Sequence, residues 1–240
     1  MSAPVSDTAD DAVFAPVRSQ TAFEETVDRL GTAIKLGLLA PGTQLPPERE
    51  LCAMLGIARS TLRQALIALG HSGHLVAVRG RGGGTFVAER PPPPDRPTDT
   101  LIAQWREVCD ERLAVEVGVC VLAVERADAA ALSALSELVE VMAAHLDDFP
   151  TYRQADVRFH VGLAEATGNQ RLVTTVTEAQ SLMGDLISNI AHPPSVLESS
   201  NAQHAKLLRA IGRGDVAAAV DVMRDHLHGT EHVLAGLLPG

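Results

Sequence analysis

The chain has 240 residues, of which 46% are hydrophobic and only 3% aromatic, and its formal net charge is −10. Its cores must therefore be built mainly from Leu, Val, Ala and Met, a composition that favours packed helices. No apolar run reaches the roughly 20 residues that span a bilayer, so we expect no membrane partner. Cys52, Cys109 and Cys120 show no CxxC spacing and are expected to be reduced thiols in a cytoplasmic protein.

The charge is distributed unevenly along the chain. Residues 20–90 carry eight Lys/Arg and six Asp/Glu, a net charge of +2, whereas residues 91–240 carry eleven and twenty-one, a net charge of −10. An acidic protein can therefore contain a mildly basic part that faces DNA.

The N-terminal 90 residues contain signals for a tail and a first helix. Residues 1–11 are acidic and small and lack the basic and apolar regions of a signal peptide, and residues 1–19 are predicted to be a disordered tail. Thr21 and Glu24 form a capping-box pattern that opens a helix. The apolar residues that follow at helical spacing are Val27, Leu30, Ile34 and Leu38.

Two more helices and a hairpin are predicted next. The second helix should begin near Pro47 and end at Gly56. The third should run from about Ser60, with a buried stripe at i, i+3, i+4 and i+7: Leu62, Ala65, Leu66 and Leu69. Segments 75–79 and 85–87 are typical of short strands joined by a glycine-rich loop. Residues 20–90 are therefore predicted to form a winged helix-turn-helix.

The rest of the chain is predicted to be helical. Prolines 91–94 and Pro97 predict an extended linker over residues 91–100. Beyond it, the segments with helical patterns are 101–126, 128–147, 151–167, 170–190, 196–212 and 215–235. The expected N-caps and helix ends are Asp128, Asp215, Gly168 and Gly214. The predicted fold class is mainly α, with residues 101–240 forming an all-α effector-binding bundle of six to seven helices.

The third helix of the N-terminal part has features of a DNA-reading element. Arg59 and Arg63 lie four residues apart, so they share a face away from the apolar stripe. Arginine can pair bidentately with guanine, and hydroxyls such as those of Ser60 and Thr61 can contact phosphates. Further arginines on the second helix and the hairpin could reach flanking phosphates or the minor groove: Arg49, Arg79 and Arg81. One such arginine is often merely solvated, but the whole set predicts a DNA-binding face.

Three segments of this part resemble the GntR family of bacterial regulators. They are LPPEREL at 45–51, LRQAL at 62–66 and RGRGGGTFV at 79–87. The resemblance implies DNA contacts at Arg49, Arg59, Ser60, Thr61, Arg63, Arg79 and Gly80. Two positions depart from the family pattern: Pro47 replaces a small residue, and Ala58 replaces the Ser or Thr that usually caps the recognition helix. Losing that cap should cost about 1 kcal/mol.

Four residues of the helical part are candidate metal ligands. Asp156 and His160 are four apart on one predicted helix, and His204 and His226 lie on two later ones. Together they would form an N3O set suited to Zn²⁺, Ni²⁺, Mn²⁺ or Fe²⁺. The spacing alone is a weak signal among nine histidines, for which surface or hydrogen-bonded positions are common. The similarly spaced pair near the C-terminus is expected to be solvated: His228 and His232.

Residues 101–235 resemble the FCD-type effector domain of the FadR subfamily of GntR regulators. The matching segments are DVRFH at 156–160 and the stretch from His204 to His226. The resemblance implies that Asp156, His160, His204 and His226 hold a metal, most simply zinc, which helps to bind a carboxylate. The spacing of Arg112 and Glu116 also matches, which implies that Arg112 grips that carboxylate. The alternative is a surface ion pair.

We therefore expect a ligand-controlled regulator, most simply a repressor, that binds a palindromic operator in double-stranded DNA as a homodimer and senses a small organic acid. A fatty acyl-CoA effector is an alternative in the same class, although a filled metal set argues against a long apolar tunnel. A metal-dependent enzyme is the remote alternative. No HExxH, nucleophile elbow or phosphate loop occurs, and catalytic zinc usually has three protein ligands rather than four.

Overall fold

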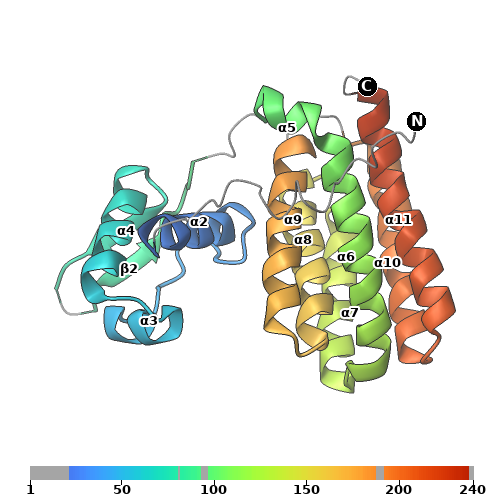
Figure 1. The fold of residues 1–240 in the computed structure, drawn as a ribbon, viewed down its shortest axis with the longest axis horizontal. Helices are drawn as coiled ribbons and strands as arrows, with labels where there is room; N and C mark the ends of the chain where they lie inside the picture. The colour runs from blue at the N-terminus through green and yellow to red at the C-terminus, as the bar shows by residue number, and fades with distance from the viewer. Residues whose placement is uncertain (1–21, 81, 93–96, 188–191, 238–240) are drawn as a thin grey trace, which may run out of the picture.

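The computed structural model of the chain describes residues 22–80, 82–92, 97–187 and 192–237. A small unit containing α2, α3, α4 and a two-stranded sheet lies beside a bundle of long helices (Figure 1). α9 lies on the side of the bundle nearest to α2, and α11 lies on the far side. The predicted tail, Thr21, Arg81 and the linker residues 93–96 lie outside the described residues.

The small unit is a winged helix-turn-helix, as predicted. Its elements are α2 (Ala22–Lys35), α3 (Glu48–Leu55), α4 (Arg59–His71), β1 (Leu75–Val78) and β2 (Gly84–Val87). β1 and β2 are antiparallel, with Leu75 opposite Val87. The core is formed by residues from every one of these elements: Leu30, Ile34, Leu45, Leu51, Leu62, Leu69, Leu75 and Val87.

The helix ends of this unit follow the local sequence. α3 begins one residue after Pro47, which is its N-cap, and Gly56 ends it in the left-handed conformation with φ 66°. Ala58 is the N-cap of α4 and provides no side-chain hydrogen bond to the helix. The cap that the family pattern would supply is therefore missing from the start of this helix.

The end of α2 differs from the prediction. Leu38 does not continue the helix, because α2 ends at Lys35 and Gly37 turns the chain with φ 67°. Leu36 is buried in the core of the bundle instead, and Leu38 packs against the same core. The segment after α2 is therefore anchored on the bundle, and the helical period alone gave a wrong assignment for Leu38.

Seven helices form the bundle within the described part of the chain. They are α5 (Asp99–Ala103), α6 (Trp105–Arg126), α7 (Ala129–Ala144), α8 (Phe149–Ala166), α9 (Gln170–Ile187), α10 (Pro194–Gly212) and α11 (Val216–Leu237). The predicted helix 101–126 is divided at Gln104, where φ is −101° and ψ is 10°. Leu101 before the break and Trp105 after it pack in the same apolar cluster.

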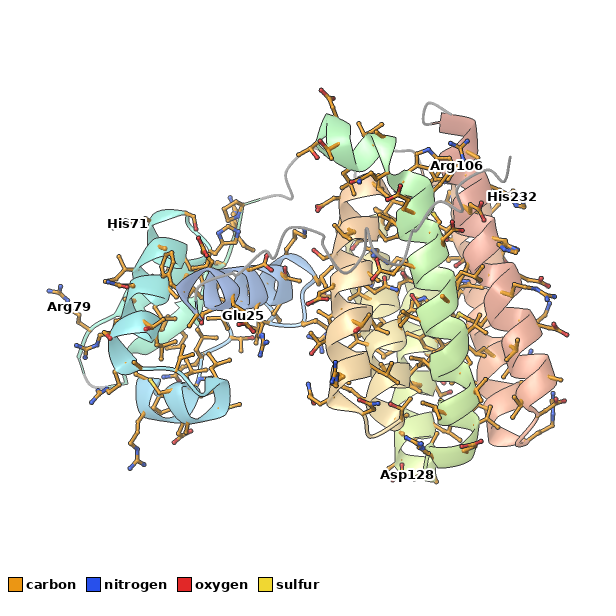
Figure 2. The ribbon with its side chains drawn as sticks, viewed as in Figure 1. Glu25, His71, Arg79, Arg106, Asp128 and His232 are labelled. Atoms are coloured by element: carbon orange, nitrogen blue, oxygen red, sulfur yellow. The ribbon has the colours of Figure 1, made fainter. Side chains whose placement is uncertain are left out.

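The predicted caps of the bundle helices are confirmed. Asp128 Oδ1 accepts a hydrogen bond from Ala131 N at 2.8 Å, and Asp215 Oδ1 accepts one from Ala218 N at 3.0 Å. Figure 2 shows Asp128 at the end of the bundle where α7 begins. None of the described helices is long and apolar enough to cross a membrane. Cys52, Cys109 and Cys120 are free.

α8 is the most enclosed helix of the bundle. It packs against α6, α7 and α9, and half of its residues are buried. Two of the buried side chains, Asp156 and His160, are polar. Buried polar groups need polar partners, so both side chains are expected to contact other polar groups or an ion.

Candidate metal centre and DNA-binding face

Asp156 and His160 of α8, His204 of α10 and His226 of α11 meet in the core of the bundle. We call these four residues the metal cluster; all of them are buried. The Nε2 atom of His226 lies 3.2 Å from that of His204 and 3.3 Å from that of His160. Asp156 Oδ1 lies 3.4 Å from His204 Nε2 and 3.7 Å from His160 Nε2. Four ligands at zinc bond lengths in a tetrahedron are separated by roughly 3.4 Å, so the spacing fits a metal ion.

Hydrogen bonds to the outer ring nitrogens orient two of the histidines. His160 Nδ1 contacts Glu116 Oε2, and His226 Nδ1 lies 3.3 Å from Gln203 Oε1. Both oxygens can accept a hydrogen bond from the ring Nδ1–H, and in that tautomer each Nε2 faces into the cluster, as a metal ligand requires. A cation between them would be stabilised by these nitrogen atoms and by the Asp156 carboxylate.

The protonation states in the cluster also suit a metal. Burial lowers the pKa of His204 to about 3, and burial together with the neighbouring His204 and His160 lowers the pKa of His226 well below 6.5. Burial alone would raise the pKa of Asp156, but His160 and Arg153 lower it to about 2. His204 and His226 are therefore neutral and Asp156 is ionised at pH 7, which are the metal-binding forms.

Glu116 on α6 joins the cluster to a buried arginine. Its Oε1 accepts hydrogen bonds from Arg112 Nε at 2.7 Å and from Gln180 Nε2 at 2.9 Å, while its Oε2 contacts His160. Arg112 is 3% exposed and Glu116 2%, so a surface ion pair is the wrong interpretation of their spacing. Burial opposes ionisation of Glu116, but Arg112 and His160 outweigh it and hold its pKa well below the usual range. Sequence reasoning paired Glu116 with Arg112 and missed its contact with His160.

Arg153 is a second, partly buried arginine that the sequence did not indicate. Its Nη1 lies 2.5 Å from Asp156 Oδ2, and its Nη2 donates to the carbonyl oxygen of Gln180 at 2.9 Å. The i, i+3 spacing of Arg153 and Asp156 on one helix was the only available signal. Arg153 thereby fixes the carboxylate oxygen that does not face the histidines.

A cavity of about 350 Å³ lies beside the metal cluster. Asp156 and His226 of the cluster line it, as do Arg112 and Arg153. Arg112 Nη2 also lies 3.3 Å from His160 Nε2, so its guanidinium reaches the inner side of the cluster. The candidate metal centre and the candidate effector cavity therefore adjoin each other, with two arginines beside the metal cluster.

The two arginines of α4 share one exposed face. Arg63 Nε lies 2.9 Å and Arg59 Nη2 3.6 Å from the same atom, Glu48 Oε2 of α3. Their side chains remain 61% and 67% exposed. Ser60 is exposed and Thr61 half-buried at the start of the same helix. These four residues therefore lie at the solvent side of α4, away from its buried leucines.

The remaining candidate DNA contacts lie on α3 and on the hairpin. Arg49 on α3 and Arg79 after β1 are exposed, and Gly80 turns the chain at the tip of the hairpin with φ 101°. Figure 2 shows Arg79 projecting away from the bundle. His228 is half-buried and His232 exposed, and neither belongs to the metal cluster.

Each of the two units matches a known protein family. The description "Bacterial regulatory proteins, gntR family" matches residues 23–87, and the description "FCD domain" matches residues 107–229. The chain belongs to the GntR family. The predicted resemblance is thereby confirmed, and so is the prediction of a transcription regulator rather than an enzyme, because GntR-family proteins are regulators.

Two GntR-family relatives and one solved structure illustrate the similarity. "Putative HTH-type transcriptional regulator RmpR" of Mycobacterium gastri is 34% identical over 215 residues, covering 84% of this chain and 76% of that protein. "Putative L-lactate dehydrogenase operon regulatory protein" of Escherichia coli (strain K12) is 31% identical over 220 residues, covering 85% and 83%. The structure of E. coli McbR/YncC shares the fold, with a TM-score of 0.58 and 19% identity over 91% of this chain and 99% of that one.

Proposed function

We propose that this GntR-family protein is a ligand-responsive repressor in which a small organic acid binds beside a divalent metal. The observation that carries the proposal is the convergence of the four buried metal-cluster residues at one end of the 350 Å³ cavity. The metal would supply a Lewis-acidic position for the carboxylate, and Arg112 would donate hydrogen bonds to it. Zinc suits the ligand spacing, while Ni²⁺, Mn²⁺ or Fe²⁺ would use the same N3O set with added positions.

The proposed DNA contacts are Arg49, Arg59, Ser60, Thr61, Arg63, Arg79 and Gly80. In the free protein, Arg59 and Arg63 form ion pairs with Glu48. On DNA, both side chains would exchange Glu48 for base edges or phosphates. We propose that the protein acts in the cytoplasm as a homodimer, since two recognition helices about one duplex turn apart would read a palindromic operator.

α8 provides a physical route from the site to the DNA-binding unit. Gln154 and Arg158 of this helix donate hydrogen bonds to the carbonyl oxygen of Gly37, just after α2. Lys35 at the end of α2 also forms an ion pair with Asp185 of α9 at 2.9 Å. A ligand that favours one position of α8 would therefore favour one position of the winged helix.

A second cavity lies at the contact between the two units. It has a volume of about 360 Å³ and is lined by residues 34–37 and by α8 and α9. Phe149, Arg153 and Ile187 line both this cavity and the effector cavity. A ligand that moves this shared wall would change the contact between the bundle and the winged helix.

The test begins with the metal. Protein freed of its affinity tag should contain about one divalent metal per chain, and Asp156→Ala combined with His204→Ala should abolish metal binding. His228→Ala combined with His232→Ala is the matched control and should leave it unchanged. A wild-type protein that binds no metal under any loading condition contradicts the proposed site.

The second step concerns the ligand and the DNA. Carboxylic acids should raise the melting temperature of the metal-loaded protein and leave that of the metal-free protein unchanged. The same acids should release the protein from a DNA site selected from a random library. Tighter DNA binding with acid would overturn the repressor form of the proposal, and acids that act equally without metal would overturn the metal-assisted site.

A further inference from the structure

The effector cavity extends along the helices away from the metal cluster. Asp156 on α8, Gln203 on α10 and His226 on α11 line the metal end. The cavity is also lined by Phe149 on α8, Val196 on α10 and Val233 on α11. Each of these lies seven residues from the metal-end residue of its own helix. Seven residues of α-helix span about 10 Å, so the cavity reaches roughly two helical turns beyond the metal.

On α8, α10 and α11 the cavity extends away from the metal cluster in the same direction. α10 and α11 are antiparallel neighbours joined at Gly214, so earlier residues of α10 lie beside later residues of α11. The Phe149 ring stacks on His192, which precedes α10, with the ring centroids 3.4 Å apart. Phe149, Val196 and Val233 therefore lie toward one end of the cavity, opposite to the metal cluster.

The charged groups of the cavity are confined to its metal end. Among the described lining residues, the charged ones are Arg112, Arg153 and Asp156, and all three contact a residue of the metal cluster or belong to it. Burial lowers the pKa of His192, so its ring is neutral at pH 7. The far part of the cavity offers a ligand no charged partner among these residues.

Apolar side chains line the body of the cavity. They are Phe149, Tyr152, Met183, Ile187, Val196, Leu197 and Val233. The Tyr152 hydroxyl donates to the carbonyl oxygen of Leu197 at 3.0 Å. Ser195, Val196 and Ser199 are exposed and lie toward solvent, whereas the half-buried Ser200 and Thr230 add two hydroxyls to the wall. A carboxylate at the metal would therefore have a mainly apolar wall, without a charged group, along the rest of its length.

From this division we infer that the effector is a monocarboxylic acid with an apolar chain or aromatic ring extending up to about 10 Å from the metal. This inference rests on the proposed metal-assisted carboxylate site. A short hydroxy acid would leave the apolar wall uncovered. A second carboxylate at the far end would lose its hydration without gaining a charged partner.

The test uses zinc-loaded full-length protein and calorimetric titration with acetate, butanoate, hexanoate, phenylacetate and hexanedioate. Each methylene buried between acetate and hexanoate should tighten binding about fourfold. Phenylacetate should bind more tightly than acetate, and hexanedioate more weakly than hexanoate. Hexan-1-ol, which has the chain without the carboxylate, should not compete with acetate at equal concentration.

A variant that fills the far end of the cavity provides a second test of the inference. Val233→Trp should reduce the preference for hexanoate over acetate to near one, while the metal content stays at the wild-type level. His232→Trp is the matched control, because His232 is the exposed neighbour on the same helix (Figure 2). The control should keep the wild-type preference.

The outcomes separate the inference from the proposed function. Equal metal-dependent binding of acetate and hexanoate, or tighter binding of hexanedioate, overturns the inference and leaves the proposed site intact. An unchanged preference in Val233→Trp also overturns it. Failure of every acid to bind the zinc-loaded protein overturns both the inference and the proposed function.

Discussion

Arg158 Nη2 lies 2.7 Å from the carbonyl oxygen of Gly37 and ties α8 to the segment that follows α2. Gln154 Nε2 donates to the same oxygen at 2.8 Å from one turn earlier. Asp156 and His160 lie two residues after Gln154 and Arg158, so the two pairs occupy opposite faces of the helix. α8 thus carries candidate metal ligands on one face and contacts to the winged helix on the other.

Removing this contact should uncouple the two units. In Gln154→Ala combined with Arg158→Ala, we expect one thermal transition to become two, with the winged helix melting first because its core is small. Differential scanning calorimetry measures this directly. Arg171→Ala, a change at an exposed arginine on α9, should keep the wild-type profile. A single unshifted transition in the double variant would show that Gly37 does not join the units energetically.

The recognition helix can be tested through Arg63. Arg63→Ala should weaken binding to a selected DNA site by roughly 5-fold to 150-fold, the range expected from loss of one bidentate base contact. Fluorescence anisotropy at fixed salt concentration gives the affinity. Arg209→Ala, which removes an exposed charge from α10, is the control for net charge and should change the affinity little. Wild-type affinity in Arg63→Ala would remove α4 from its proposed role.

The sequence predicted the features that depend on local periodicity and capping. Helical spacing located each long helix, and Asp128 and Asp215 could be assigned as N-caps because a capping side chain acts on its own first turn. Asp156 and His160 could be paired because residues at i and i+4 share a helix face. Their meeting with His204 and His226 came from the family resemblance, since spacing within one helix says nothing about its neighbours.

The features that the sequence did not reveal depend on contacts between elements. Leu36 and Leu38 look like a continuation of α2, but they pack against the bundle after the turn at Gly37. Gln180 reaches Glu116 across 64 residues of chain, so no local pattern could indicate that hydrogen bond. The break at Gln104 divides the predicted helix 101–126, although Leu101 and Trp105 on its two sides pack in one apolar cluster.

Glu116 should act as a positioning residue for the metal. Glu116→Gln keeps the size of the side chain but removes the charge that orients His160 and neutralises Arg112. We expect metal affinity to fall about 10-fold to 100-fold. Competition with a chromogenic chelator measures the affinity, and circular dichroism checks the fold. Glu111→Gln removes an exposed charge from the same helix and should leave the affinity unchanged. Equal affinities for the two variants would contradict this role.

The metal-free protein should lose stability as the pH falls below about 6.5. Burial lowers the pKa of His204 from 6.5 to about 3 in the folded state, and the pKa of His226 is lowered too. Below pH 6.5 the unfolded chain therefore binds protons at both residues, whereas in the folded chain His204 binds its proton only near pH 3 and His226 only well below pH 6.5. The free energy of unfolding should consequently fall with acidification, by at most about 1.4 kcal/mol per pH unit for each histidine.

Urea unfolding in the presence of a chelator, at several pH values between 7.5 and 4.5, measures this slope. The part of this range above about pH 5.5 stays clear of 4.5 and 3.8, the ordinary pKa values of Glu116 and Asp156, whose own contributions are lost only at lower pH. His204→Gln should reduce the slope because it removes one of the two groups, whereas His232→Gln should not, since His232 is exposed. A free energy of unfolding that stays constant from pH 7.5 to 5 would mean that these histidines are not held neutral by burial.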